Sequence, residues 1–286
     1  MDLETIPTDA PVLIVGPTAS GKSALAMKIS DAGGGTIVNA DALQVYSNWR
    51  ILTARPSAEE EAAFPHALYG HIGPNDPYSV GHWLREVGRI LSDGSRPIIV
   101  GGTGLYLSSL TEGLADIPET PPDMRSQGDA LALPDLIKAL DPQTASRIDL
   151  QNRARVQRAW EVLKATGRPL AAWQEETSPP LLPLENCIAL RVDADKDWLS
   201  ERIERRFDLM IEEGALDEVR ANLEAFDATR PACRAIGAPE LVAHLNGDCT
   251  LGEARTAAII STRRYAKRQR TWMRARMKSW QSLAYP

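Results

Sequence analysis

The feature that most constrains the fold of this chain is a glycine-rich loop near its amino end. The loop matches the pattern Gly-x-x-x-x-Gly-Lys-Ser/Thr with the residues Gly16, Pro17, Thr18, Ala19, Ser20, Gly21, Lys22 and Ser23. An apolar run, Val12 to Val15, precedes it, and a helix-like stretch over residues 24–29 follows. In such a loop, backbone N–H groups wrap a polyphosphate and the helix dipole favours its negative charge. The sequence therefore predicts an α/β domain that binds a diphosphate or a triphosphate.

Two side chains of this loop suggest what it does with the phosphates. Lys22 would supply a point charge, and the hydroxyl of Ser23 could hold a magnesium ion. A purely structural strand-to-helix turn is the alternative, because glycine-rich turns also occur by chance. The eight matched positions and the two flanking segments favour the phosphate loop.

Composition excludes several classes of protein. The length of 286 residues allows one large domain or two small ones with enough chain to bury a core. No apolar stretch approaches the roughly 18 residues of a membrane span, and residues 1–4 lack the layout of a secretory signal. The three cysteines are far apart and the four histidines lack metal-ligand spacing. We therefore expect a cytoplasmic enzyme without a membrane partner, a disulfide framework or a zinc site.

Charge is distributed unevenly along the chain. The formal net charge is −6, which taken alone argues against a nucleic-acid partner, but residues 254–286 contain no acidic side chain. That segment carries nine basic residues, which are Arg255, Arg263, Arg264, Lys267, Arg268, Arg270, Arg274, Arg276 and Lys278. Such a patch is typical of a surface that binds a polyanion, although a solvated helix face is the usual explanation of a basic run.

Short runs rich in Ile, Val and Leu alternate with helical segments, as they do in a buried parallel sheet. The predicted strands cover residues 11–15, 36–39, 97–100 and 187–192, and the predicted helices near the carboxyl end cover 197–213, 216–226 and 251–280. Ligands of open α/β sheets bind at the carboxyl ends of the strands. The fold class we predict is a P-loop-containing parallel sheet flanked by helices, with its active site at that edge.

A change of composition interrupts this pattern. Prolines crowd both edges of the stretch between about residues 115 and 183, and its interior shows helical periodicity without strands. We expect helices over 134–140 and 152–166. The predicted organisation is a catalytic core formed by residues 1–115 and 187–286, interrupted by an all-helical insertion domain over 116–186.

Two loops after predicted strands carry candidate catalytic groups. Asp41 follows the second strand, where a carboxylate can ligate a metal or take a proton from a nucleophile; a helix N-cap is the alternative. Gly101-Gly102-Thr103-Gly104 follows the third strand, where glycines let the backbone approach a ligand closely and the Thr103 hydroxyl can donate or accept a hydrogen bond. A loop that merely precedes a helix would look the same.

Further arginines cluster on two predicted helices. Arg153, Arg155 and Arg158 lie within the insertion, and a third basic cluster comprises Arg202, Arg205 and Arg206. Three basic clusters on an acidic protein suggest a clamp around a polyanion. Alternatively, the third cluster pairs with its acidic neighbours Glu201, Glu204, Asp208 and Glu212.

With these residues in view, the chain resembles the bacterial tRNA dimethylallyltransferase family over nearly its whole length. The resemblance rests on ordered blocks: residues 16–23, 41–46, 51–56, 65–66, 76–80, 101–106, Arg155 with 158–162, 235–237, 264–269 and 271–272. It implies that the chain transfers a dimethylallyl group from dimethylallyl diphosphate to the exocyclic amino nitrogen of the adenine 3′-adjacent to the anticodon. The phosphate loop would then hold the leaving diphosphate.

The resemblance also implies roles for individual residues. Lys22, Ser23 with Mg²⁺ and Arg206 would stabilise the leaving group, Asp41 would take the proton of the amine, and Thr103 would help position the substrate. The anticodon stem-loop of tRNA would be contacted by Asp41, Ala42, Leu43, Gln44, Thr103, Arg155, Val156, Gln157, Arg158, Arg234, Gly237, Arg264, Lys267 and Arg268. We expect the protein to act as a monomer.

Three positions depart from the family pattern. Ala42 stands where a serine is usual, Leu52 where a glycine is usual, and Ala238-Pro239 where a tyrosine and a basic residue are common. None of these changes touches Lys22 or Asp41. By physical argument alone, two other functions compete: a small-molecule or nucleoside kinase, since the same loop holds ATP with magnesium, and a nucleotide-dependent RNA-binding module without covalent chemistry.

Overall fold

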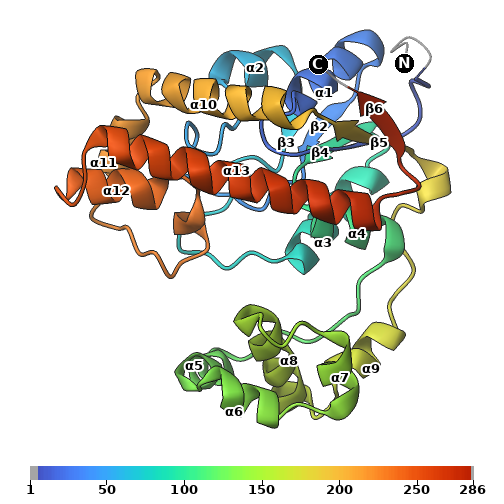
Figure 1. The fold of residues 1–286 in the computed structure, drawn as a ribbon. Coiled ribbons are helices and arrows are strands. Elements are labelled where there is room, and N and C mark those ends of the chain that lie inside the picture. Colours follow the sequence, from blue (N-terminus) through green and yellow to red (C-terminus); the bar gives the residue numbers. More distant parts are fainter. Residues whose placement is uncertain (1–5, 285–286) are drawn as a thin grey trace. The chain divides into compact units, whose positions relative to one another are not determined.

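The computed structural model describes residues 6–284 of the chain, which divides into two compact units (Figure 1). The first unit combines Met1–Thr111 with Leu182–Pro286, and the second is Glu112–Leu181. The helical insertion that we expect at 116–186 overlaps the second unit, whose bounds lie four and five residues closer to the amino end.

A six-stranded sheet forms the centre of the first unit, and every neighbouring pair of its strands is parallel. The strand order is β3-β2-β4-β1-β5-β6. The strands are β1 (Val12–Val15), β2 (Thr36–Asn39), β3 (His66–Ala67), β4 (Pro97–Gly101), β5 (Ile188–Asp193) and β6 (Gln281–Ala284). The parallel α/β fold predicted from the apolar runs is confirmed.

The central strands are apolar on both faces because helices cover both. Val12 and Ile14 of β1 pack with Ile98 of β4 and with Leu25 of helix α1 (Lys22–Gly33) in one core. Leu13, which alternates with them along β1, is equally inaccessible to water on the opposite face. This double burial explains why continuous apolar runs predicted these strands.

Strand β1 lies at the point where the direction of the connections reverses. From β1 the chain passes to β2 on one side of the sheet, and later enters β5 on the other side. At such a switch point the loops after neighbouring strands diverge and leave a crevice for a ligand. The phosphate loop follows β1 and therefore opens into this crevice.

The other helices of the first unit connect or flank the strands. They are α2 (Ala58–Ala63), α3 (Val80–Ser92), α4 (Gly104–Glu112), α10 (Lys196–Glu212), α11 (Ala215–Asn222), α12 (Ala238–Leu245) and α13 (Leu251–Arg276), with short 3₁₀ turns η2 (Leu184–Asn186) and η3 (Ala232–Arg234). Helices α10, α12 and α13 share a second apolar core that includes Ile203, Phe207, Leu241 and Ala258.

The two long helices of this group begin at side-chain caps. The carboxylate of Asp195 accepts hydrogen bonds from the first turn of α10, and Thr250 forms a capping box with Glu253 at the start of α13. Figure 1 shows α13 running beside α10. Most of the basic segment of the sequence therefore lies on one helix that packs on the core.

The carboxyl end differs from the prediction. Helix α13 ends at Arg276 rather than at residue 280, and after a short turn residues 281–284 form β6, parallel to β5. Strand β3, which spans two residues, was also not predicted. None of the helices in the described part of the chain combines the length and apolar character that crossing a bilayer requires.

The second unit has a core of its own. Its helices are α5 (Pro122–Ala130), α6 (Leu133–Lys138), α7 (Pro142–Arg147), α8 (Arg153–Thr166) and α9 (Leu170–Glu175). Leu136, Val156 and Trp160 are buried at the centre of this unit. Asn152 caps the start of α8, and Gly167 ends the helix in a left-handed conformation. No strand occurs in this unit.

Candidate active site

The phosphate loop turns sharply between β1 and α1. Ala19 and Gly21 adopt left-handed backbone angles, with φ of 63° and 87°, and the Ser20 N–H donates to the carbonyl oxygen of Pro17 at 3.2 Å. A side chain at Gly16 would approach Ser20 Oγ to 2.7 Å, so this end of the loop requires a glycine. The loop thus has the compact shape that directs N–H groups toward an anion.

Lys22 begins α1 and folds back over the loop. Its Nζ donates a hydrogen bond to the carbonyl oxygen of Pro17 at 3.3 Å. Burial lowers the pKa of Lys22 to about 8, while the carboxylate of Asp41 opposes this shift and the charge of Arg206 adds to it. The amine is therefore protonated at neutral pH and loses its charge as the pH rises through about 8.

Two arginines of α10 reach the same loop. Arg206 Nη1 donates to Thr18 Oγ1 at 3.3 Å, and Arg202 Nε donates to the carbonyl oxygen of Ala19 at 3.0 Å. Two of the four acids that were the alternative partners of this cluster bond elsewhere: Glu204 pairs with Arg263, and Asp208 pairs with Arg255 at 2.5 Å. The positive charge of Arg202 and Arg206 is thereby left facing the phosphate loop.

Asp41 follows β2 in a chain of turns, and no helix begins there before α2. Its backbone N–H donates to Oδ1 of buried Asn39 at 2.8 Å, and its own Oδ1 accepts from the N–H of Leu43 at 2.9 Å. This turn, in which an aspartate bonds the backbone two residues on, holds the carboxylate in place. Asp41 is therefore not a helix N-cap.

Thr103 is held beside Asp41. Its Oγ1 accepts a hydrogen bond from the N–H of Ala42 at 3.0 Å, and its own N–H donates to the carbonyl oxygen of Ala40 at 3.2 Å. The loops after β2 and β4 are consequently linked at the edge of the sheet. The two residues that the sequence nominated for proton transfer and positioning lie together.

The glycines of the Thr103 loop are explained by packing against α13. A Cβ atom at Gly102 would lie 2.2 Å from Gln269 Nε2, and one at Gly104 would lie 2.1 Å from the ring of Trp272. We predicted that these glycines let the backbone approach a ligand. In the structure they make room for two side chains of α13, and the approach to a ligand stays a prediction.

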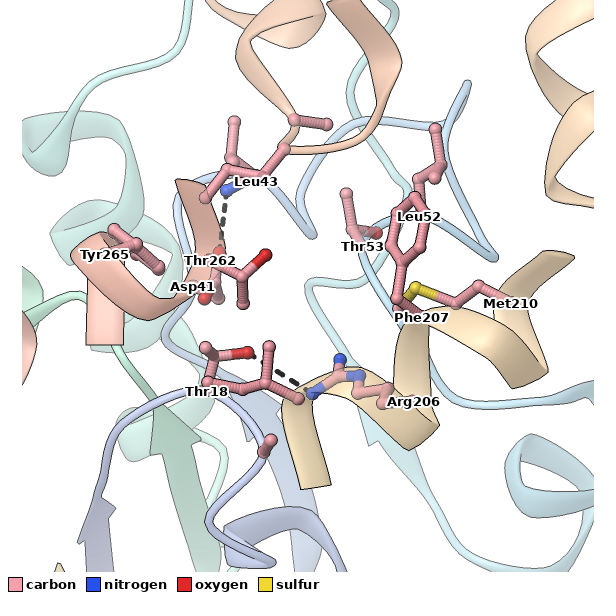
Figure 2. A pocket seen from close by; sticks show the side chains of 14 residues that line it. Thr18, Asp41, Leu43, Leu52, Thr53, Arg206, Phe207, Met210, Thr262 and Tyr265 are labelled. Atoms are coloured by element: carbon pink, nitrogen blue, oxygen red, sulfur yellow. Dashed lines mark hydrogen bonds between the residues drawn. The ribbon is translucent and has the colours of Figure 1, made fainter. Parts of the chain in front are cut away.

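A small cavity of about 80 Å³ lies between these elements. Figure 2 shows Asp41 and Tyr265 on one side of it, Leu52, Phe207 and Met210 on the other, and Arg206 reaching toward Thr18. Burial, and next the charge of Asp41, raise the pKa of Tyr265, so its phenol stays protonated. The cavity therefore joins an acid and a cation to an apolar wall.

A larger cavity of about 460 Å³ lies beside the phosphate loop. It is lined by loop residues including Lys22 and Ser23, by Arg202 and Arg206 of α10, and by Arg55. Several cations and the N-terminal end of α1 face one space. This positive environment favours the binding of a polyanion.

The residues predicted to contact RNA from the first unit have different exposures. Arg234, Arg264, Lys267 and Arg268 are exposed on η3 and α13. Gly237 is buried, with φ of 102°, and a side chain there would meet Leu52 at 2.9 Å, so Gly237 shapes the backbone beside the cavity.

Gln44 is already bonded within the protein. Its Nε2 donates to the carbonyl oxygens of Thr53 and Ala54, both at 2.8 Å, which ties the Asp41 loop to the next loop. Leu43 lines the small cavity, and Ala42 is partly exposed.

In the second unit, the predicted group on α8 divides into surface and core residues. Arg155 is exposed, and Arg158 donates to Thr120 Oγ1 and lies 3.8 Å from Glu161. Gln157 donates to Asp129 and to Glu161. Val156 is fully buried, so its side chain supports the fold and is not available to RNA. Contact of Val156 with RNA stays a prediction that its side chain does not support.

The donor set fits a magnesium ion that is carried largely by its substrate. Ser23 lines the larger cavity, and the Oγ of neighbouring Ser20 is buried there without a hydrogen-bond partner. Within residues 6–284, no group of three or more acidic, histidine or cysteine side chains could form an all-protein metal site. Mg²⁺ commonly binds in this way, through one or two protein oxygens, substrate phosphates and water.

Several residues of the site escaped the sequence argument. The sequence indicates Arg202 only as a member of a basic cluster and Gln269 only as the end of a matched block. It does not single out Phe207 or Tyr265. They reach the site from α10 and α13, far along the chain from the phosphate loop. Helical spacing places Phe207 and Gln269 on inward faces, but nothing in a single sequence says which strand ends they meet.

A phosphate loop at the switch point, arginines facing it and an acid beside an apolar cavity are the features of a P-loop α/β enzyme. The family model described as IPP transferase matches residues 44–276, and the model described as isopentenyl transferase matches residues 10–64. The chain belongs to the IPP transferase family.

Curated relatives and solved structures agree with this membership. A tRNA dimethylallyltransferase of Ruegeria sp. strain TM1040 is 61% identical over 99% of both chains, and one of Cereibacter sphaeroides strain ATCC 17029 is 62% identical over 100% of this chain and 92% of that protein. The tRNA isopentenylpyrophosphate transferase of Bacillus halodurans superposes with a TM-score of 0.69 at 32% identity, covering 97% of this chain and 90% of that one. A eukaryotic dimethylallyltransferase acting on tRNA gives 0.82 at 25% identity, covering 96% and 73%.

Proposed function

We propose that this protein transfers the dimethylallyl group of dimethylallyl diphosphate to the exocyclic amino nitrogen of the adenine 3′-adjacent to the anticodon of tRNA. The observation that carries the proposal is the small cavity, which has Asp41 on one side, an apolar wall on the other, and Thr18 of the phosphate loop at its edge. The names of the relatives, all tRNA prenyltransferases, support the same reaction.

The phosphate loop would bind the diphosphate as leaving group. Backbone N–H groups at the end of the loop and the start of α1, the ammonium of Lys22 and the guanidinium of Arg206 would neutralise the charge that grows as the bond to the allylic carbon breaks. Ser23 would hold Mg²⁺, which when bound supplies further positive charge to the diphosphate oxygens. The allylic carbon would then lie near the small cavity.

Asp41 would accept the proton. An exocyclic amine is a poor nucleophile because its lone pair is delocalised into the ring, so a hydrogen bond to a carboxylate raises its reactivity. The carbon–oxygen bond to diphosphate breaks, the nitrogen–carbon bond forms, and the amine proton passes to Asp41. Thr103, bonded to the N–H of Ala42 beside Asp41, would fix the position of the acceptor base.

The adenine must leave the stacked anticodon loop to reach the cavity, at a cost of a few kcal/mol. Contacts from the loop after β2, from exposed cations of α13 and from Arg155 and Arg158 of the second unit would offset this cost. We propose that the protein does this as a monomer, with the anticodon stem-loop as its principal RNA contact.

Incubation of the protein with unmodified tRNA, dimethylallyl diphosphate and Mg²⁺ tests the proposal. We expect a mass gain of one prenyl unit on one adenosine, with release of one diphosphate. A parallel incubation with ATP in place of the prenyl donor tests the kinase alternative. Consumption of ATP with a phosphorylated product, and no prenylated adenosine, would contradict the proposal.

A further inference from the structure

Helix α13 presents one buried amide among its cations. Gln269 is 6% exposed, whereas its neighbours Lys267 and Arg268 are exposed to solvent. A buried amide is stable only when its donor and acceptor atoms are bonded. The two atoms of Gln269 bond two different loops of the active site.

The bonds of Gln269 join the loop after β1 to the loop after β4. Its Oε1 accepts from the backbone N–H of Thr18 at 2.9 Å, and its Nε2 donates to the carbonyl oxygen of Gly102 at 3.0 Å. Thr18 belongs to the phosphate loop, and Gly102 immediately precedes Thr103. The hydrogen bond from Thr18 to the Gln269 side chain also occupies a backbone N–H group that would otherwise be free to bind phosphate.

Each of these loops is linked by a hydrogen bond to a residue at or next to a group of the proposed reaction. On the phosphate side, Thr18 Oγ1 accepts from Arg206. On the acceptor side, Thr103 Oγ1 accepts from the N–H of Ala42, the residue after Asp41. One side chain therefore lies at the centre of a bonded path from the leaving-group arginine to the proton acceptor.

We propose that Gln269 is a positioning residue that sets the separation between the diphosphate and the nucleophilic amine. The inference rests on the proposed function, and it adds a role that neither a phosphate contact nor an RNA contact describes. The close approach is built into the loop, since a Cβ at Gly102 would collide with Nε2 at 2.2 Å. In this account, Gly102 is a glycine because Gln269 must reach its carbonyl oxygen.

Replacing Gln269 with Met tests the role, because methionine fills the same space without either hydrogen bond. We expect kcat to fall by about 10- to 100-fold, since displacing reacting groups by about 1 Å costs on the order of 100-fold. The KM for dimethylallyl diphosphate should rise by less than about 5-fold, and tRNA affinity and its salt dependence should stay unchanged, because no charge is removed.

Two further variants separate positioning from general destabilisation. Gln269→Glu keeps the acceptor for Thr18 but sets a carboxylate oxygen against the Gly102 carbonyl, so its kcat should fall between wild type and Gln269→Met. Asn222→Met removes an amide that donates to Asn48 and Glu218, away from the site, and serves as the matched control. It should lower the Tm without lowering kcat.

The outcomes distinguish this inference from the proposed function. If wild type prenylates tRNA and Gln269→Met keeps kcat within about 3-fold, the positioning role is wrong and the proposed function stands. A kcat that falls equally in Asn222→Met and Gln269→Met would also overturn the role. If wild type transfers no prenyl group, the proposed function fails. Diphosphate binding measured by calorimetry then tests only the contact between Gln269 and Thr18. If Gln269→Met bound diphosphate with unchanged affinity and enthalpy, the positioning role of that contact would be wrong.

Discussion

Asp41 has the central chemical role in the proposed reaction, because it would accept the proton of the amine. Its carboxylate is fixed by a bond from Leu43 N–H, and it acts electrostatically on both Lys22 and Arg206. Among the residues around the small cavity it is the only carboxylate. A general base there must be held in place before the substrate arrives, which the local turn achieves.

Substituting Asp41 with Asn should lower turnover by about 10²- to 10⁴-fold, the usual contribution of acid–base catalysis, while tRNA affinity stays nearly intact. Asp93→Asn, at an exposed helix end, is the control for the loss of one negative charge. Single-turnover prenylation checks the prediction. Turnover within about tenfold of wild type would show that Asp41 is not the base.

The lowered pKa of Lys22 makes diphosphate binding dependent on pH. The amine is charged below about 8 and neutral above it, so the loop loses a positive charge as the pH rises through that value. The Kd for diphosphate should therefore rise by up to about tenfold per pH unit above 8. Calorimetry between pH 6.5 and 9.5 measures it; Lys22→Arg, which stays charged, should show a flat profile. A flat wild-type profile would contradict the assignment.

At the scale of elements, α13 has two faces of different character. Its inward face carries Gln269 and Trp272 against the glycines of the Thr103 loop. Its outward face exposes Arg264, Lys267 and Arg268. Other cations of the same helix are neutralised, since Arg255 and Arg263 pair with acids of α10. Counting basic residues in the sequence thus overstates the charge that is free to meet RNA.

This division predicts which arginines affect RNA binding. Replacing Arg264 and Arg268 with Gln should weaken tRNA binding and reduce the slope of log K against log salt by about 1.4 to 1.8, the value for two phosphate contacts. The matched control is Arg255→Gln, whose charge is paired with Asp208. An unchanged slope in the double variant, or an equal change in the control, would exclude α13 as the phosphate contact.

At the scale of the whole molecule, each unit has its own core. Leu136 lies fully buried in the second unit, far along the chain from the phosphate loop. Leu136→Ala should destabilise that unit by about 2–5 kcal/mol, the usual cost of such a cavity, and leave diphosphate affinity unchanged. Hydrogen exchange over residues 112–181 together with calorimetry checks this. If Leu136→Ala lost diphosphate affinity together with hydrogen-exchange protection over residues 112–181, the claim that the two units have separate cores would be wrong.

The sequence predicted the parts of the fold whose burial is strong and local. Strands β1, β2, β4 and β5 are apolar runs, and the phosphate loop has a fixed spacing, so both were found with their bounds within a residue or two. Strand β3 has two residues, and β6 is mostly exposed, so neither leaves an apolar pattern. Helix α13 ends without a glycine or proline, and the prediction extended it too far.

The same dependence on local patterns explains which residues of the site were predicted from the sequence. Asp41 and Thr103 lie directly after strands β2 and β4, and Lys22 ends the loop that follows β1, so sequence order alone places them at one edge of the sheet. Gln269 reaches that edge from a helix 251 residues beyond Thr18. Which loop an inward-facing helical residue meets depends on tertiary packing, and one sequence does not encode that pairing in any local signal.

The most direct test of the account is a crystal structure of the protein with a non-reactive thiolo analogue of dimethylallyl diphosphate and an anticodon stem-loop. The account predicts the diphosphate within residues 16–23 and the amino nitrogen of one extruded adenine within hydrogen-bond distance of the Asp41 carboxylate. A diphosphate bound elsewhere, or an adenine whose amino nitrogen faces away from Asp41, would contradict it.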